Sequence, residues 1–160
     1  MRKKALIAII IFNLLLGIYI GLLSLHQYKS THFSCQGEFT GANDRSTIRN
    51  RIYLNFSGQQ GSSFLDGELT TASGAKQKVR VYYQFSFTRK GNEYSIIQQS
   101  PSALAGNEVD EAALKPLFPE YMTSAKKNGH ITLYRVSPSA FIVSNSYLPI
   151  FYCRLTDRHG

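Results

Sequence analysis

The feature of the sequence that most limits its fold is an uncharged run of 21 residues, 5–25, in which the only polar side chains are Asn13, Tyr19 and Ser24. A helix needs about 20 apolar residues to cross the hydrocarbon core of a bilayer. A cleaved signal peptide is the alternative, but its apolar core usually has about 7–15 residues and ends at a small-x-small site. Cleavage after Ser24 would place Leu22 at the third position back, which fits such a site poorly. We therefore expect a membrane anchor that is retained.

The charged residues before the apolar run predict how the anchor is oriented in the membrane. Arg2, Lys3 and Lys4 precede the apolar run, and no acidic residue does. The positive-inside rule then places the N-terminus in the cytoplasm and the rest of the chain outside. The whole chain carries 18 basic and 10 acidic residues, a net charge of +8, but without those three residues the balance is 15 to 10, or +5. Such a mildly basic exported part is not expected to bind nucleic acid directly. We expect a cytoplasmic tail at 1–4, the transmembrane helix at 5–25, a polar stalk at 26–32 and an exported domain at 33–160.

The two cysteines, Cys35 and Cys153, lie near opposite ends of the exported part. Disulfides form and persist in oxidising compartments outside the cytoplasm. Cys35 alternates in step with Phe33, and Cys153 with Phe151 and Leu155, so both cysteines are expected on the inward faces of their strands. We expect them to form a structural disulfide; two separate buried thiols are the alternative. Neither cysteine has a second cysteine or a histidine at ligand spacing, which argues against a metal site.

Apolar residues in the exported part alternate with polar ones, which is the period-2 pattern of half-buried strands. Turn sequences rich in glycine, serine and asparagine separate the segments, and residues 89–92 are expected to join two strands as a hairpin. The predicted strands lie at 33–40, 51–56, 63–71, 79–88, 93–99, 131–136, 140–144 and 148–156.

The pattern changes over residues 100–129. Asn107 is a favourable N-cap, and acidic residues follow it in what would be the first helical turn. Pro116 and Pro119 limit any single helix to about two turns, because an interior proline removes a backbone donor. Residues 126–129 are expected to close the insert as a turn. The predicted fold is therefore mainly β, of the α+β type: an antiparallel sheet that curls into a barrel or a sandwich, with one short helical insert.

Catalysis needs a nucleophile with its base, a metal site or a carboxylate pair. His130 opens a predicted strand without further ligands nearby. Ser124 and Lys127 form a Ser-x-x-Lys match, but the companion Lys-Thr-Gly and Ser-Asp-Asn elements of penicillin-binding enzymes are absent. Asp66 and Glu68 share one strand face, which fits a solvent-facing edge better than an acid-base pair. We predict no enzymatic activity and no cofactor.

A row of basic side chains and a high aromatic content indicate contact with other molecules. Lys76, Lys78 and Arg80 alternate in the sequence, which puts them on one face. Outside the cytoplasm, such a row is expected to be a solvated face or a docking patch for an acidic partner or an anionic ligand. The chain has 10 tyrosines and 10 phenylalanines but no tryptophan. We expect an aromatic core and enough exposed tyrosine to support an interface with a protein.

Five features follow one another along the chain in a recognisable order. They are the basic N-terminus with one anchor, Cys35-x-Gly37, Tyr83-x-Phe85-x-Phe87, Pro119 after the helical insert, and Pro149-x-Phe151-x-Cys153-x-Leu155. Their order and spacing resemble the FidL-like membrane proteins of enteric bacteria, and the resemblance spans nearly the whole chain. The individual motifs are short and structural, so the resemblance depends on their combination.

The resemblance implies a protein partner. FidL-like proteins are similar to the ToxS type, small inner-membrane proteins that accompany a single-pass transcriptional regulator with a cytoplasmic winged-helix DNA-binding domain. It implies a bacterial inner-membrane location, a periplasmic domain, and a heterodimer in which this chain stabilises or modulates the regulator. The family supplies no catalytic residue, and only Cys35 and Cys153 carry over, as the structural disulfide.

Strand edges are the expected means of binding, because an open antiparallel sheet exposes unpaired backbone groups to which a partner can add strands. Two alternatives stay open. The first is a membrane-anchored carrier or sensor that holds an amphipathic small molecule, such as a bile salt or a lipid, in an aromatic barrel interior. The second is a small periplasmic enzyme.

Overall fold

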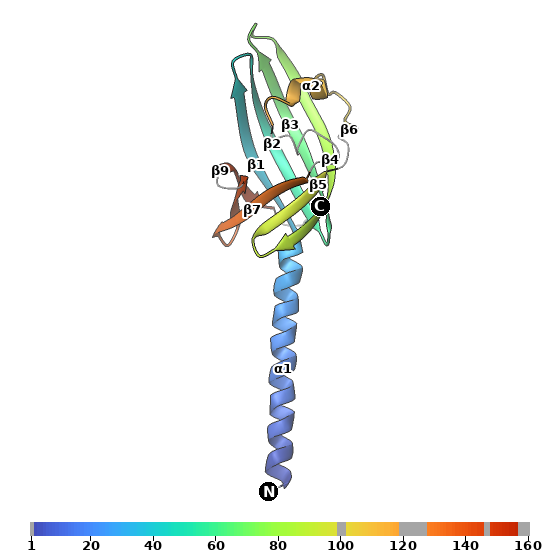
Figure 1. Ribbon diagram of the computed structural model, residues 1–160, viewed down its shortest axis with the longest axis vertical. Coiled ribbons are helices and arrows are strands. Elements are labelled where there is room, and N and C mark those ends of the chain that lie inside the picture. Colours follow the sequence, from blue (N-terminus) through green and yellow to red (C-terminus); the bar gives the residue numbers. More distant parts are fainter. Residues whose placement is uncertain (1, 99–101, 119–127, 146–147, 157–160) are drawn as a thin grey trace. The chain divides into compact units, whose positions relative to one another are not determined.

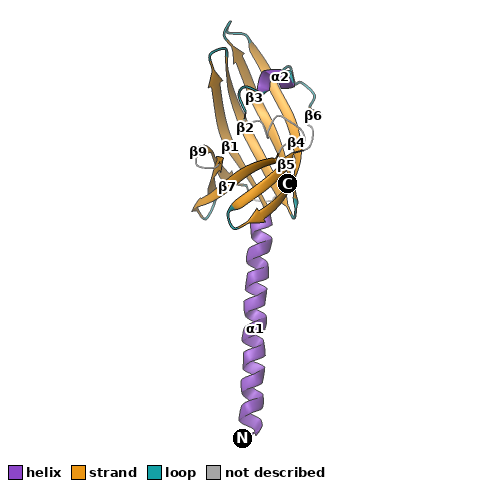
Figure 2. Ribbon diagram, viewed as in Figure 1, coloured by secondary structure: helices purple, strands orange, loops and turns teal. Residues whose placement is uncertain are grey.

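The computed structural model describes residues 2–98, 102–118, 128–145 and 148–156 (Figure 1). The chain divides into two compact units, Met1–His32 and Phe33–Gly160. The first consists of helix α1 (Arg2–Thr31), and the second is built almost entirely from strands (Figure 2). One N-terminal helix followed by a mainly β domain is the predicted class of fold, and the structure confirms it.

Helix α1 has the length and composition of a membrane span. Its stretch Ile9–Thr31 is long and apolar enough to cross a bilayer. Apolar side chains lie on all sides of the helix, as expected for a helix surrounded by lipid rather than packed on a core. The amide Nδ2 of Asn13 donates a hydrogen bond to the carbonyl of Ile9 at 2.8 Å, which satisfies one donor of this polar side chain within the helix. The helix continues through residues 26–31 of the expected stalk.

Eight antiparallel strands close into a barrel. Each strand pairs with the next, β3 pairs with β4, and β9 returns to pair with β1, so the circle of strands is complete. The sheet is therefore closed into a barrel, which is one of the two arrangements expected, and the open sheet expected to offer its edges to a partner is not what the chain forms. The strands are β1 (His32–Asn43), β2 (Ser46–Ser57), β3 (Gln60–Thr71), β4 (Lys76–Lys90), β5 (Glu93–Gln98), β7 (Asn128–Ser137), β8 (Ala140–Asn145) and β9 (Leu148–Leu155).

The strands differ in length, so within the described part of the chain the short strands pair with only part of the long strands β1 and β4. Strands β1 to β4 have 12 to 15 residues, whereas β5 and β7 to β9 have 6 to 10. Among the described residues, strand β5 pairs with Phe85–Lys90 of β4, and β9 pairs with Cys35–Gly37 of β1. The long strands therefore extend beyond the short ones (Figure 1).

The insert after β5 covers this extension. It contains the two-residue strand β6 (Ser102–Ala103) and helix α2 (Glu111–Leu114), and it buries Leu114, Leu117 and Phe118. Phe118 stacks on Phe39 of β1, with ring centroids 5.0 Å apart. The insert is thus anchored by three buried apolar side chains, and one of them, Phe118, also makes the ring contact with β1.

Two details of the insert differ from the prediction. The N-cap of α2 is Asp110 instead of Asn107, because the side chain of Asn107 bonds to the backbone of β4. Asn128 and Gly129 belong to β7 and do not form a turn. The rest of the expected turn, residues 126 and 127, lies outside the described residues.

Aromatic rings form a cluster in the core of the barrel, as the composition predicts. Phe56 is fully buried. Its ring stacks on Phe33 at 4.6 Å between centroids and meets Phe87 and Tyr94 edge-on at 5.1 and 5.3 Å. Edge-on and stacked pairs of this kind contribute energy beyond the burial of their area. The core is therefore a packed structure of rings contributed by β1, β2, β4 and β5.

Candidate interaction surface

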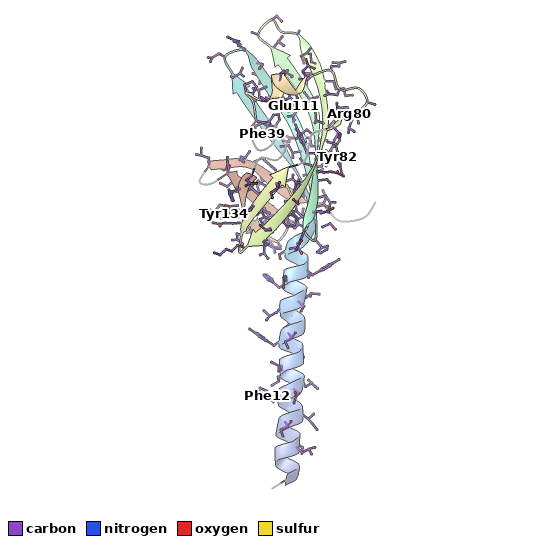
Figure 3. The ribbon with its side chains drawn as sticks, turned by 45° about the vertical axis from the view of Figure 1, so that its right-hand side comes forward. Phe12, Phe39, Arg80, Tyr82, Glu111 and Tyr134 are labelled. Atoms are coloured by element: carbon purple, nitrogen blue, oxygen red, sulfur yellow. A yellow bond between two sulfur atoms is a disulfide. The ribbon has the colours of Figure 1, made fainter. Side chains whose placement is uncertain are left out.

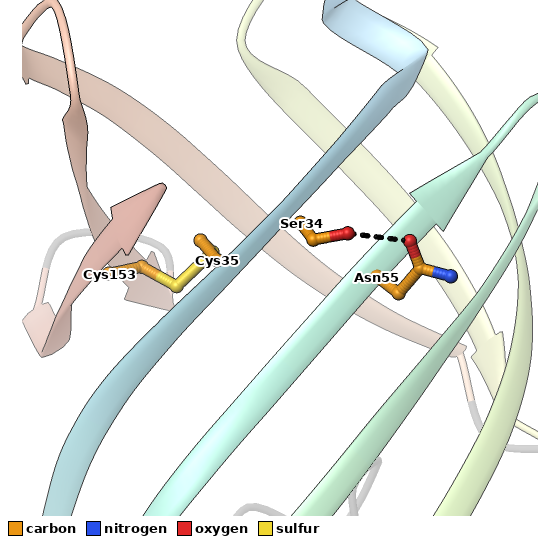
Figure 4. Close-up of a disulfide and its surroundings, with 4 residues drawn as sticks. All are labelled: Ser34, Cys35, Asn55 and Cys153. Carbon is orange, nitrogen blue, oxygen red and sulfur yellow. Dashed lines mark hydrogen bonds between the residues drawn. A yellow bond between two sulfur atoms is a disulfide. The ribbon is translucent and has the colours of Figure 1, made fainter. Parts of the chain in front are cut away.

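The predicted disulfide between Cys35 and Cys153 is present and joins β1 to β9 (Figure 4). The register places Gly37, not Cys35, directly opposite Cys153, so the bond runs diagonally between the strands. A Cβ on Gly37 would lie 2.6 Å from Cδ2 of Phe151, so only glycine leaves room for that ring. On the other side of β1, Ser34 Oγ donates to Asn55 Oδ1 of β2 at 2.9 Å. Strand β1 is thus held on both sides.

The outer face of β2, β3 and β4 carries three rows of side chains that run across the strands. Direct register pairs define the rows, so neighbours within a row lie side by side. Acidic residues occupy the middle strand and basic residues the flanking strands in two of the rows, and the third row is aromatic. The rows are Arg49, Glu68 and Lys78; Arg51, Asp66 and Arg80; and Tyr53, Phe64 and Tyr82.

The aromatic row is an outward ladder of half-buried rings. Tyr53 and Phe64 stack with their centroids 5.8 Å apart, and Phe64 is the direct partner of Tyr82. A hydrogen bond with Tyr53 raises the pKa of the exposed Arg51 guanidinium. The guanidinium carbon of Arg80 lies 5.9 Å from the centroid of the Phe64 ring. This face combines aromatic and arginine side chains, the types that are enriched in protein interfaces.

Asp66 and Glu68, the carboxylate pair noted in the sequence, lie on this outer face of a central strand rather than at an edge. Glu68 Oε1 lies 2.8 Å from Lys76 Nζ, and Asp66 Oδ1 lies 3.7 Å from Arg80 Nε. Each carboxylate thus has its own cation. Lys76 and Arg80, two members of the basic row predicted from the sequence, are the cations of these pairs.

The remaining sequence candidates are dispersed. His130 lies on the outer face of β7, where its Nδ1 is 3.1 Å from Ser95 Oγ on β5. Ser124 and Lys127 lie outside the described residues. Within the described ranges, no three His, Cys, Asp or Glu residues are grouped so that they could hold a metal ion.

Residues 102–109, which we call the strap, run along the part of β4 that β5 does not reach. Strand β6 starts the strap by pairing with Val81 and Tyr82. Further on, Asn107 Oδ1 accepts a hydrogen bond from the Arg80 backbone N–H at 2.9 Å, and Glu108 Oε2 accepts one from the Lys78 N–H at 2.8 Å. Two side chains therefore take the place of the carbonyls that a neighbouring strand would supply.

Arg80 is the residue on which the strap and the outer face meet. Its backbone bonds to Asn107 and Leu104, and its Nη1 donates to the carbonyl of Ala105 at 3.0 Å. The same guanidinium lies beside Asp66 and over Phe64. Figure 3 places Arg80 and Tyr82 on one side of the domain and Tyr134 on the other.

Three polar side chains point into the barrel without hydrogen-bond partners among the described residues: Asn50, Ser63 and Tyr83. Gly67 stands directly opposite Asn50, and Ser63 stands opposite Tyr83. Burial raises the pKa of the Tyr83 phenol, and the nearby charge of Glu111 raises it further. Ser144 is buried as well, but its Oγ donates a hydrogen bond to the carbonyl of Leu148 at 2.8 Å.

A second row of outward-facing side chains lies on β7, β8 and β9. Tyr134, Ile142 and Tyr152 are direct register partners in turn, and both tyrosines are about half exposed. Next to it, Tyr152, Arg154 and Arg51 line an open hollow of about 490 Å³. A smaller hollow of about 290 Å³ follows between Arg51 and Asp66.

The sequence did not indicate the roles of Asn107 and Glu108. A polar and an acidic residue after a glycine suit a helix N-terminus equally well, and no local signal identifies a side chain that bonds to a distant strand. The ladder of Tyr53, Phe64 and Tyr82 could not be predicted from the sequence for a related reason. Its members come from three strands, and only the register of the sheet brings them together.

The sequence matches no known family and no curated protein. The fold and its surfaces are therefore the basis, together with the motif resemblance, on which a function is proposed.

Proposed function

We propose that this chain is an inner-membrane accessory protein whose periplasmic barrel binds and stabilises a ToxR-like, single-pass transcriptional regulator as a heterodimer. The observation that carries the proposal is the outer ladder of Tyr53, Phe64 and Tyr82 beside Arg51 and Arg80. Aromatic and arginine side chains that lie together on rigid strands are the usual centre of a protein interface.

Two observations support a periplasmic location for the barrel. Arg2, Lys3 and Lys4 favour a cytoplasmic N-terminus, and with that orientation the barrel would lie in the periplasm. A disulfide between Cys35 and Cys153 is consistent with that oxidising space. A regulator with one membrane span would then have its own periplasmic segment in reach of the barrel, while its DNA-binding domain stays in the cytoplasm. The barrel itself needs no contact with nucleic acid.

Co-purification of the full chain from detergent-solubilised membranes tests the proposal. A tagged wild-type chain is expected to recover a winged-helix protein with one membrane span. Tyr53→Ala/Tyr82→Ala is expected to lower the recovery at least about tenfold, because truncation of central aromatic residues has the largest effect on binding. Tyr134→Ala, which truncates an exposed tyrosine on the other side of the domain, is the matched control and keeps the recovery. Equal recovery with both variants would place the interface elsewhere, and no recovery with the wild type would end the proposal.

A second candidate function is a carrier or sensor of an amphipathic molecule such as a bile salt or a lipid. The unpartnered Asn50, Ser63 and Tyr83 favour it, because buried polar groups normally have hydrogen-bond partners and a ligand can supply them. Mass spectrometry of an organic extract of the purified full chain tests this candidate. A single retained amphiphile, lost in Asn50→Leu but not in the surface variant Asn55→Leu, supports it; an extract with detergent alone rejects it.

A further inference from the structure

The edge of β4 that carries the strap has an unusual set of hydrogen bonds. The backbone donors of Lys78 and Arg80 both go to side chains, Glu108 and Asn107. Their carbonyls accept from the N–H groups of Glu108 and Leu104, at 2.9 and 3.0 Å. The opposite edge of the same segment forms a regular ladder with β3. At Lys78 and Arg80, one edge of β4 is therefore paired as a strand, and the other is closed by the part of the strap that follows strand β6.

The strap departs from a strand in the middle. Gly106 has a φ of +81°, and the N–H of Asn107 bonds back to the carbonyl of Leu104, so residues 104–107 form a turn instead of following β4. This turn is the reason that side chains have to reach the β4 donors. A short exposed segment held by such bonds belongs to the low-stability end of a protein.

Burial within the strap is small. Val109 is its one buried side chain, Asn107 is half-buried, and residues 102–106 and Glu108 are exposed. Little apolar area would therefore return to water if the strap left the β4 edge. What would be lost is a set of hydrogen bonds, and an extended peptide segment can replace every one of them.

We propose that residues 102–109 are a displaceable strap, which keeps the β4 edge closed until an extended acidic segment of the partner protein pairs with that edge in its place. This inference rests on the proposed function for the existence of the partner, and it adds where the partner pairs and what it displaces. While the partner is absent, the strap occupies the β4 edge and prevents other strands from pairing with it nonspecifically.

The charged side chains around the β4 edge indicate the composition of the partner segment that would pair with it. Lys78 and Arg80 flank it on the outer face, and the strap brings Glu108 there, followed by two more acidic residues, Asp110 and Glu111. On the inner side the strap supplies Val109. When a peptide adds to a sheet as a strand, its backbone gives the affinity and its alternate side chains give the specificity. The partner segment is therefore an extended stretch with a carboxylate facing Lys78 and an apolar residue in the place of Val109.

The first experiment uses a synthetic peptide with the sequence of residues 102–110 and hydrogen exchange of the full chain in micelles. In the wild type, the strap-facing amides of Lys78 and Arg80 are expected to exchange at least about tenfold faster than the β3-facing amides of Val79 and Val81. Asn107→Ala/Glu108→Ala is expected to increase exchange at Lys78 and Arg80 by a further factor of about ten, and the peptide at about 1 mM to reverse that increase.

Two controls make this measurement decisive. A peptide with lysine in place of the glutamate at position 108 is expected to give no protection. Unchanged exchange at Val79 and Val81 shows that the variant keeps its barrel. Protection by the acidic peptide alone supports the inference. Equal exchange at all four amides of the wild type, or no protection by the acidic peptide, overturns it.

The second experiment locks the strap. The register pair Val81 and Ala103 is replaced by Val81→Cys/Ala103→Cys, and Thr47→Cys/Thr70→Cys, a pair between β2 and β3, serves as the matched control. After oxidation, the locked chain is expected to recover at least tenfold less of the winged-helix membrane protein than the control chain. Equal recovery overturns the inference and leaves the proposed function standing. If the control chain recovers no such protein, the proposed function fails, and the peptide measurement decides whether the edge opens.

Discussion

Cys35 and Cys153 are bonded diagonally across two adjacent strands, and the glycine directly opposite Cys153 accommodates the Phe151 ring. The bond links residues 118 positions apart at one seam of the barrel, and both side chains are buried. In the described residues, β1 and β9 share three register pairs, so this covalent link supplements a short stretch of backbone pairing.

The double variant Cys35→Ala/Cys153→Ala is expected to lower the free energy of unfolding by about 2–5 kcal/mol. Without the bond, the unfolded chain regains the conformational entropy that the closed loop removes. Urea unfolding of the full chain in micelles, followed by tyrosine fluorescence since the chain has no tryptophan, measures the change. Labelling of the denatured, unreduced wild type is expected to find no free thiol. Two labelled thiols, or a change below about 0.5 kcal/mol, would contradict the role given to the bond.

Gly37→Ala is expected to destabilise the barrel by about 1–3 kcal/mol, because its Cβ would meet the Phe151 ring and the carbonyl of Tyr152. The neighbouring outer-face variant Gln36→Ala is the control and is expected to change stability by less than about 0.5 kcal/mol. The same unfolding experiment compares them. Equal effects would mean that the close approach of Phe151 does not require glycine.

Phe56→Ala is expected to cost about 3–5 kcal/mol, because it removes the ring at the centre of the aromatic cluster and leaves a cavity. Phe56→Leu keeps most of the volume and is expected to cost less. Tyr53→Ala, on the outer face of the same strand, is the control for loss of an aromatic side chain without a core cavity. A cost for Tyr53→Ala as large as that for Phe56→Ala would contradict the placement of the core.

The expected pH dependence comes from the buried phenols. Burial raises the pKa of Tyr83 and of Tyr94, although Arg89 partly opposes the shift at Tyr94. The folded state thus keeps these protons at a pH where the unfolded chain has lost them, since an ordinary tyrosine has a pKa of about 10. The stability associated with the neutral phenols is fully present below about pH 10 and falls as the pH rises further.

Tyr83→Phe tests this dependence. It is expected to reduce the loss of stability between about pH 7 and pH 11. At neutral pH it is expected to leave stability unchanged or to raise it by about 1 kcal/mol, because the hydroxyl has no partner among the described residues. Tyr152→Phe, at an exposed tyrosine, is the control. An identical alkaline loss in Tyr83→Phe and the wild type would contradict the assignment.

The sequence predicts the strands well where apolar and polar residues alternate, and less well where a polar residue faces inward. Strand β2 begins at Ser46, five residues before the predicted start. The reason is Asn50, which occupies an inward position between Ile48 and Ile52 and interrupts the apolar alternation. The disulfide could be predicted because both cysteines fall in step with apolar neighbours on their strands.

Closure of the barrel and the surface that follows from it could not be predicted in the same way. Closure depends on the pairing of β9 with β1, more than 100 residues apart in sequence, and no local pattern encodes that register. The role of Asn107 depends equally on distant residues. Alone, it resembles a helix cap; beside the unpaired edge of β4, it bonds to Arg80 instead.

We propose that the barrel stabilises a membrane-bound regulator. The abundance of that regulator in membranes tests this most directly. Quantitative mass spectrometry compares cells with the chain, without it, and with Tyr53→Ala/Tyr82→Ala. Loss of a stabilising partner is expected to lower the abundance of one winged-helix, single-span protein about fivefold, and the wild-type chain, but not the variant, is expected to restore it. Unchanged abundance of every winged-helix membrane protein in all three strains would contradict the claim.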